Sequence, residues 1–71
     1  MQVETMEVVV NGERKTVPCD VTITALLNAL EIPAERVAVE LNRSIVRKRS
    51  WEETRVPRGS QIEIVQFVGG G

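Results

Sequence analysis

The sequence ends in three glycines, Gly69-Gly70-Gly71, which directly follow the strand-like run Ile62-Glu63-Ile64-Val65-Gln66-Phe67-Val68. Without a Cβ, glycine adopts backbone conformations closed to other residues and lets another backbone approach closely. Three extended residues reach roughly 10 Å, at about 3.3–3.6 Å each. The pattern predicts a flexible tail over residues 69–71 that enters a narrow channel and presents the Gly71 carboxylate to the active site of a partner. A frayed chain end is the alternative explanation.

Two other groups of residues could carry chemistry. Cys19, the single cysteine, has neither a histidine nor a Cys-x-x-Cys partner to activate its thiol, and we expect a partly buried residue at a strand end. A basic group consists of Arg43, Arg47, Lys48, Arg49, Arg55 and Arg58. It lacks the interleaved aromatic residues that stack on nucleic-acid bases. We expect a solvated surface, or a docking surface for an acidic partner, rather than a phosphate or RNA site.

Length and composition favour a protein on which enzymes act over one that is itself an enzyme. A 71-residue chain makes one domain, and a domain of this size has little room for a deep substrate cleft. The chain has no histidine, no tyrosine and one cysteine, a poor set for acid–base or metal chemistry. We therefore expect no catalytic residue, no metal and no intrinsic cofactor.

Charge and hydropathy indicate the surroundings of the protein. Residues 1–35 carry six acidic and two basic side chains, a net of −4, whereas residues 36–71 carry four acidic and seven basic ones, a net of +3. Surfaces of different sign help to orient a docking partner, but the total of −1 is unlike a nucleic-acid-binding domain. No apolar stretch approaches the ~20 residues that span a membrane, and the N-terminus lacks a signal peptide. We expect a cytoplasmic protein with neither a nucleic-acid nor a membrane partner.

A β-hairpin is predicted at the start of the chain. Residues 6–10 are mostly β-branched. Asn11-Gly12 follows, and this pair is the strongest short hairpin signal because both central residues of a type I′ turn need a positive φ. Residues 14–18 then return as the second strand.

A helix of two to three turns comes next. Thr22 is the expected N-cap, with Asp20 as the other candidate, and Pro33 prevents further extension. An apolar stripe at i, i+3, i+4 and i+7 is formed by Ile23, Leu26, Leu27 and Leu30.

Three further strands are predicted, at residues 37–41, at Ile45-Val46 on an edge, and at residues 61–68. Ser50 and Glu53 have the spacing of a capping box, and a helical turn there would let Trp51 cover an open edge of the core. One helix on one face of a mixed sheet of four to five strands is an α+β domain, which we place over residues 1–68.

The last strand should present an apolar face away from the helix. We expect the helix stripe to pack on Val8, Val10, Val39, Leu41, Ile62 and Ile64. Strict alternation then places Val65 and Phe67 on the open face, where they join Val9 and the adjacent Val68 in an exposed patch. Such patches commonly mark interfaces; scattered surface hydrophobic residues are the alternative.

Four stretches make the whole chain resemble the ThiS-type sulfur carriers of thiamine synthesis, which have the ubiquitin-like β-grasp fold. They are Val9-Val10-Asn11-Gly12, Thr22-Ile23-Thr24-Ala25-Leu26-Leu27, Val37-Ala38-Val39-Glu40-Leu41-Asn42 with Ile45-Val46, and Ser50-Trp51 with residues 62–71. The hairpin and the helix occur in many β-grasp proteins, whereas the remaining stretches are more specific. Two features depart from the family: Gly59-Ser60 stands where Gly-Asp is common, and Gly69 precedes the usual pair Gly70-Gly71.

The resemblance implies a carrier cycle. An E1-like adenylating enzyme would use ATP to adenylate the Gly71 carboxylate, while Gly69 and Gly70 thread its channel. Sulfur from a persulfide sulfur donor would displace AMP and leave a thiocarboxylate, from which a thiazole synthase takes the sulfur. A carboxylate is a poor electrophile, so the adenylate supplies the leaving group, and the reacting atoms must come within about 3–3.5 Å.

Three alternatives stay open. The small subunit of molybdopterin synthase is also a sulfur carrier, but such proteins usually show a proline-rich approach to the Gly-Gly end, and Gln66-Phe67-Val68 has no proline. A ubiquitin-like protein modifier would join Gly71 to lysines. A β-grasp binding module would have no use for the tail.

Overall fold

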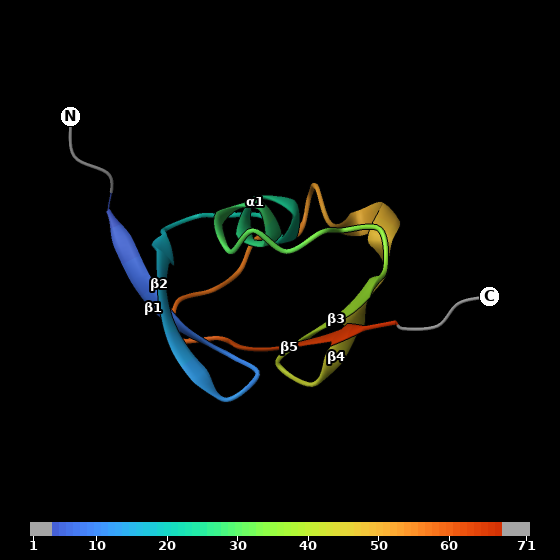
Figure 1. Ribbon diagram of the computed structural model, residues 1–71. Helices are drawn as coiled ribbons and strands as arrows, with labels where there is room; N and C mark the ends of the chain where they lie inside the picture. The colour runs from blue at the N-terminus through green and yellow to red at the C-terminus, as the bar shows by residue number, and fades with distance from the viewer. Residues whose placement is uncertain (1–3, 68–71) are drawn as a thin grey trace.

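The computed structural model describes residues 4–67. Its elements in chain order are strand β1 (Thr5–Val10), strand β2 (Glu13–Pro18), helix α1 (Ile23–Ala29), strand β3 (Val37–Leu41), strand β4 (Ser44–Val46), the 3₁₀ helix η1 (Lys48–Ser50) and strand β5 (Gln61–Gln66). Figure 1 shows α1 and η1 on one side of the sheet, and none of the described elements covers the other side. The predicted α+β class is confirmed.

Within the described residues the sheet has five strands in the order β2-β1-β5-β3-β4. β5 lies in the centre, parallel to β1 and antiparallel to β3. The hairpins β1–β2 and β3–β4 are antiparallel. The sheet is therefore mixed, as predicted, and its last strand in sequence is held between two hairpins.

Both hairpins turn through left-handed residues. Asn11 and Gly12 have φ values of 50° and 84°, which confirms the predicted turn with two positive φ angles. Asn42 and Arg43 repeat this pattern with φ values of 50° and 74°, although no glycine marks that turn in the sequence. Asparagine is among the few residues with a side chain that tolerate this region.

Helix α1 begins as predicted. The Thr22 side chain accepts a hydrogen bond from the N–H of Ala25 at 3.1 Å, which makes Thr22 the N-cap. Asp20 lies before the helix in a left-handed conformation, with φ of 65°.

Helix α1 has the predicted length of about two turns and ends before Pro33. Glu31 turns left-handed, with φ of 59°. Its N–H donates to the carbonyl of Asn28 at 3.1 Å, and the N–H of Ile32 donates to the carbonyl of Leu27 at 2.9 Å. These two bonds form a Schellman motif, so α1 has already ended when the chain reaches Pro33.

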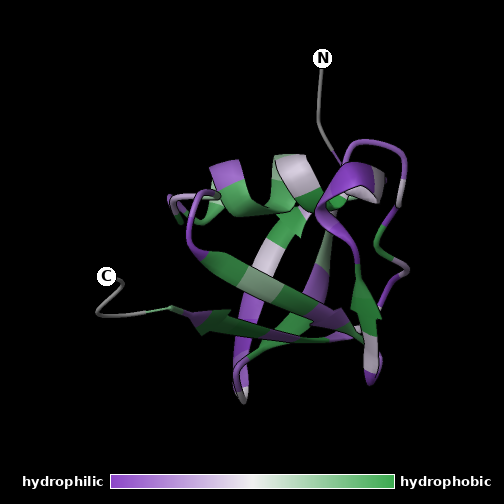
Figure 2. Ribbon diagram, turned by 90° about the vertical axis from the view of Figure 1, so that its right-hand side faces the viewer, coloured by the Kyte–Doolittle hydropathy of each residue, from purple (hydrophilic) through white to green (hydrophobic). Residues whose placement is uncertain are grey.

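The hydrophobic core lies between α1 and the sheet. Ile23, Leu26 and Leu27 are buried to 1% exposure or less, and they pack with buried residues of the sheet, as predicted: Val8, Val10, Val39 and Ile62. Leu30, Leu41 and Ile64 are only partly buried at the margin of this core. The core has further members that the predicted set lacks: Met6, Val17, Val21, Val37, Trp51 and Val56. Figure 2 shows the hydrophobic stretches of the strands beneath α1 and hydrophilic residues at the hairpin tips.

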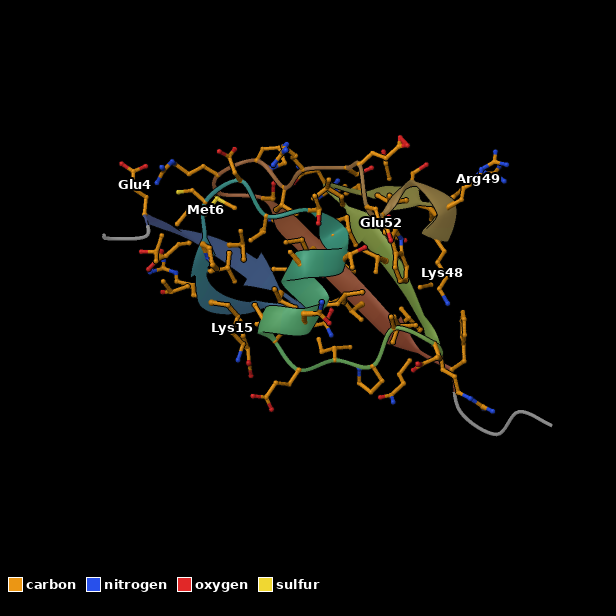
Figure 3. All side chains as sticks on the ribbon, turned by 90° about the horizontal axis from the view of Figure 1, so that it is seen from above. Glu4, Met6, Lys15, Lys48, Arg49 and Glu52 are labelled. Atoms are coloured by element: carbon orange, nitrogen blue, oxygen red, sulfur yellow. The ribbon has the colours of Figure 1, made fainter. Side chains whose placement is uncertain are left out.

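The helical turn near Trp51 lies earlier than predicted. It spans Lys48–Ser50, and its N-cap Arg47 makes no side-chain capping bond, so the capping box predicted at Ser50 is wrong. The role predicted for Trp51 is confirmed, because the residue is 4% exposed and its Nε1–H donates to the carbonyl of Val46 at 2.8 Å. The Lys48 Nζ lies 5.9 Å from the ring centroid, and in Figure 3 Lys48 and Arg49 point away from the body of the molecule.

Candidate functional site

The chain approaches its glycine end through β5. Gln66 pairs with Val37 of β3, and the N–H of Phe67 donates to the carbonyl of Arg36 at 2.7 Å. The predicted carrier residue Gly71, the threading residues Gly69 and Gly70, and Val68 lie outside the described residues. The described geometry therefore concerns the strand and the surface that lead to the tail.

Val65 and Phe67 lie on the open face of the sheet, as alternation along β5 predicts. Each is 57% exposed, whereas Ile64 between them packs against the core. Ile45 of β4 is 73% exposed and is a third large apolar side chain on this face. We call Ile45, Val65 and Phe67 the sheet-face patch. Val65 lies opposite Ala38 of β3, and Ile45 lies opposite the next residue of β3 on that face, Glu40.

Val9 lies on the same face but does not adjoin this patch. It is half-buried and pairs with Gln61, four residues along β5 from Val65. At about 3.3 Å per residue this separation is about 13 Å, and Glu63 occupies the same face between them. The predicted patch therefore has to be corrected. Val9 lies apart from Val65 and Phe67, and Ile45 is a further exposed apolar side chain of the same face, on the far side of β3 from Val65.

The sequence contains a signal that would have found Ile45. In the pair Ile45-Val46, only one residue of a strand can face the core, because successive side chains point to opposite faces. Val46 packs against the core, which leaves Ile45 exposed. The prediction treated the pair as one apolar unit and so missed its outward-facing member.

Charged side chains border the sheet-face patch. Glu40 and Glu63 lie directly opposite each other on the open face. Arg47 directly follows β4, and continuation of the β3–β4 register places it opposite Ala38. Within residues 4–67 the one ion pair joins Lys15 to Glu13 at 3.4 Å, far from this surface. An apolar centre with charges of both signs at its margin suits a docking surface with a defined orientation.

Two asparagines tie the hairpin turns to β5. The Asn11 Oδ1 accepts from the N–H of Ile64 at 2.7 Å, and the Asn11 Nδ2–H donates to the carbonyl of Ile64 at 3.1 Å. The Asn42 Oδ1 accepts from the N–H of Gln61 at 2.9 Å, and its Nδ2–H donates to the Ser60 Oγ at 3.3 Å. The sequence predicts the first turn, but it carries no signal for these side-chain bonds.

The buried Ser60 completes the second of these ties. It is 2% exposed, and its Oγ–H donates to the carbonyl of Pro57 at 2.6 Å. Gly59-Ser60, which stands where Gly-Asp is common in the family, forms the turn before β5. The hydroxyl and backbone of Ser60 are all hydrogen-bonded in this turn.

Cys19 lies where the sequence predicts, half-buried just after β2. The Arg58 Nη2–H donates to its Sγ at 3.4 Å. Residues 4–67 contain no group of three His, Cys, Asp or Glu residues placed to hold a metal ion, and this part of the chain encloses no pocket. None of its helices is long and apolar enough to cross a bilayer.

Comparison with known proteins places this geometry in a family. The sequence model of the ThiS family matches residues 4–71. The chain belongs to the ThiS family. The crystal structure of the thiamine biosynthesis protein ThiS from Geobacter metallireducens superposes with a TM-score of 0.82 at 38% identity, covering 93% of this chain and 100% of that one. This similarity confirms the predicted β-grasp fold.

Two similar proteins are a sulfur carrier and a thiazole synthase. The sulfur carrier protein ThiS of Bacillus subtilis is 40% identical over 50 residues, which cover 70% of this chain and 76% of that protein. A thiazole synthase of Paramagnetospirillum magneticum is 42% identical over 66 residues, which cover 93% of this chain. The chain spans only 20% of the length of that thiazole synthase, so the similarity concerns one segment of a larger protein.

Proposed function

We propose that this protein is a cytoplasmic sulfur carrier of thiamine biosynthesis and that the Gly71 carboxyl group carries the sulfur. The observation that supports this most directly is the ThiS family match, which extends through Gly71. Membership of this family makes the chain a carrier protein rather than a catalyst. The 40% identity over 50 residues to the Bacillus subtilis sulfur carrier agrees with this proposal.

The proposed chemistry activates a carboxylate that is unreactive by itself. On an E1-like adenylating enzyme, a Gly71 carboxylate oxygen attacks the α-phosphorus of ATP and pyrophosphate leaves. The terminal sulfur of a persulfide donor then attacks the carbonyl carbon, and AMP leaves. A thiol attacks the donor sulfur of the resulting acyl disulfide and releases the thiocarboxylate. This chain supplies the acyl group and its delivery, and the partners supply the ATP site and the sulfur.

We further propose a thiazole synthase as the acceptor of the sulfur. The Paramagnetospirillum magneticum thiazole synthase contains a segment similar to 93% of this chain. A carrier-like segment within one synthase supports a functional contact between the separate carrier and a synthase of the same kind.

The sheet-face patch is the proposed contact with the adenylating enzyme. Val65 and Phe67 lie four to six residues before Gly71 in the sequence, so an enzyme that holds the tail also lies near these side chains. Val68 and Val9 were predicted to share this contact. Val9 lies about 13 Å from Val65, so we expect Val9 to contribute less to this contact than Val65 does.

The proposal is tested with two tail variants and the cognate adenylating enzyme. Gly70→Val adds a branched side chain where the backbone must thread a confined channel, and a misplacement of about 1 Å can cost on the order of a hundredfold in rate. Removal of Gly71 leaves the terminal carboxylate about 3.3–3.6 Å short of the reacting atoms. We expect both variants to lose AMP formation and thiocarboxylate mass while they unfold at the temperature of the wild type.

Gly70→Ala is the graded control, since it adds a single methyl group and should lie between wild type and Gly70→Val. Equal rates for wild type, Gly70→Val and the chain without Gly71 would contradict the carrier function.

A further inference from the structure

We propose that Asn11 is a positioning residue for the acyl group: its carboxamide fixes the direction in which β5 leaves the sheet. This inference rests on the proposed function and adds to it a residue of the first hairpin. Asn11 and Ile64, which its side chain contacts, are 53 positions apart in the sequence. Neither residue belongs to the glycine tail or to the sheet-face patch.

The two edges of β5 are supported over different lengths. Toward β3, pairing continues to Gln66 and then to the N–H of Phe67. Toward β1, strand pairing covers only Gln61 and Ile62, because β1 ends at Val10 and the chain turns away. Without further contacts, the part of β5 nearest the tail would be held on one edge alone.

Asn11 supplies the missing support. Its backbone N–H donates to the carbonyl of Ile62 at 2.9 Å. Its side chain then bonds both the N–H and the carbonyl of Ile64, at 2.7 and 3.1 Å, as the backbone of a neighbouring strand residue would. Among the described residues, these are the last bonds on this edge of β5 before Phe67.

Loss of this tie would reorient the end of the strand. The twist between strands varies and is larger where fewer strands are paired, and β5 beyond Ile62 would become an edge strand held by β3 alone. The described chain from Ile64 to Phe67 is three residues long and spans about 10 Å when extended. A change of about 6° in direction at Ile64 displaces Phe67, from which the tail starts, by about 1 Å, and a misplacement of about 1 Å can cost on the order of a hundredfold in rate.

The chain offers a matched control at Asn42. Asn11 and Asn42 have the same φ of 50°, so glycine, which adopts this region freely, replaces either one without straining its turn. Each substitution removes two side-chain hydrogen bonds to or near β5. Asn42 bonds Ser60 and Gln61 at the start of the strand, whereas Asn11 bonds Ile64 toward its end.

The experiment measures pyrophosphate release by the cognate adenylating enzyme with ATP and the full-length chain as wild type, Asn11→Gly or Asn42→Gly. We expect Asn11→Gly to lower kcat by about 10- to 100-fold and to change KM by a smaller factor, since Ile45 keeps its place and Val65 and Phe67 stay on the open face. Asn42→Gly should keep kcat within about threefold of wild type. Both variants should lower the thermal midpoint by similar amounts, about 5–10 °C.

A second measurement reports the geometry without the enzyme. Residual dipolar couplings of the Val65, Gln66 and Phe67 amides should change in Asn11→Gly and stay unchanged in Asn42→Gly. Asn11→Asp is the second variant if Asn11→Gly unfolds, because it tolerates a positive φ and keeps the acceptor for Ile64 while it loses the donor.

The outcomes separate this inference from the proposed function. If wild type is active and the two glycine variants lose kcat equally, or if Asn11→Gly keeps the wild-type kcat, Asn11 has a structural role only and the inference is wrong. If wild type itself releases no pyrophosphate with its cognate enzyme, the proposed function fails and the inference fails with it.

Discussion

Replacement of Phe67 by alanine should weaken binding to the adenylating enzyme by about 5- to 30-fold. Phe67 is 57% exposed, so of a side chain of roughly 200 Å² about 110 Å² remains for a partner to cover. At about 25 cal/mol per Å², complete burial would contribute at most about 3 kcal/mol. Side-chain ordering and desolvation offset part of this gain, which leaves about 1–2 kcal/mol, where 1.4 kcal/mol is a factor of ten in Kd.

Isothermal titration calorimetry with the adenylating enzyme measures this loss directly. Val65→Ser should weaken binding as well but by a smaller factor, since Val65 has the same exposed fraction as Phe67 on a smaller side chain. Val9→Ala is the control on the same face, and its half-buried position apart from the patch predicts a smaller loss. Thermal unfolding of each variant excludes a general loss of the fold. Unchanged affinity for both Phe67→Ala and Val65→Ser would refute the assignment of the sheet-face patch.

Three further substitutions test the fold in denaturant unfolding. Leu27→Ala should lower the free energy of unfolding by about 2–5 kcal/mol, because the Leu27 side chain of α1 is 1% exposed in the core; a variant as stable as wild type would mean that the core is misassigned. Glu31→Gly should raise the free energy of unfolding by about 1 kcal/mol, because a residue with a side chain is strained at φ of 59° and glycine is not. A destabilised variant would contradict the Schellman end of α1. Glu63→Gln should raise the free energy of unfolding by about 0.2–1 kcal/mol, because it removes the repulsion between Glu63 of β5 and Glu40, directly opposite on β3. This gain in stability should shrink in high salt, and a loss of stability would argue against this strand register.

Features that depend on local chemistry were predictable from the sequence. Asn11-Gly12 needs no distant partner to form its turn, and Thr22 caps α1 through a bond to Ala25, three residues away. The apolar stripe that contains Leu27 follows from helix periodicity alone. The exposed positions of Val65 and Phe67 follow from strand alternation once the inner face is known.

The ends of the helical segments were less predictable. The predicted length of α1 holds, but its left-handed end at Glu31 has no signal in the sequence, because glutamate rarely adopts this conformation. Ser50 and Glu53 have capping-box spacing, but the turn is completed earlier, at Lys48–Ser50.

Pairing between distant strands could not be deduced from local patterns. The register of β1 against β5 places Val9 beside Gln61, away from Val65, and no local pattern contains that register. The same holds for the bonds between Asn11 and Ile64, which form only when the first hairpin meets the last strand. The part of the site that the sequence misses is thus the part that depends on long-range pairing.

The most direct test of the carrier function is the intact mass of the full-length chain after incubation with its adenylating enzyme, ATP, a persulfide donor and a thiol. Replacement of the terminal OH by SH adds about 16 Da, and fragmentation should place this addition on Gly71. An unchanged mass would contradict the sulfur-carrier function. So would an addition of about 32 Da on Cys19, the mark of a persulfide, because it would place the sulfur on the thiol instead of the terminal carbonyl.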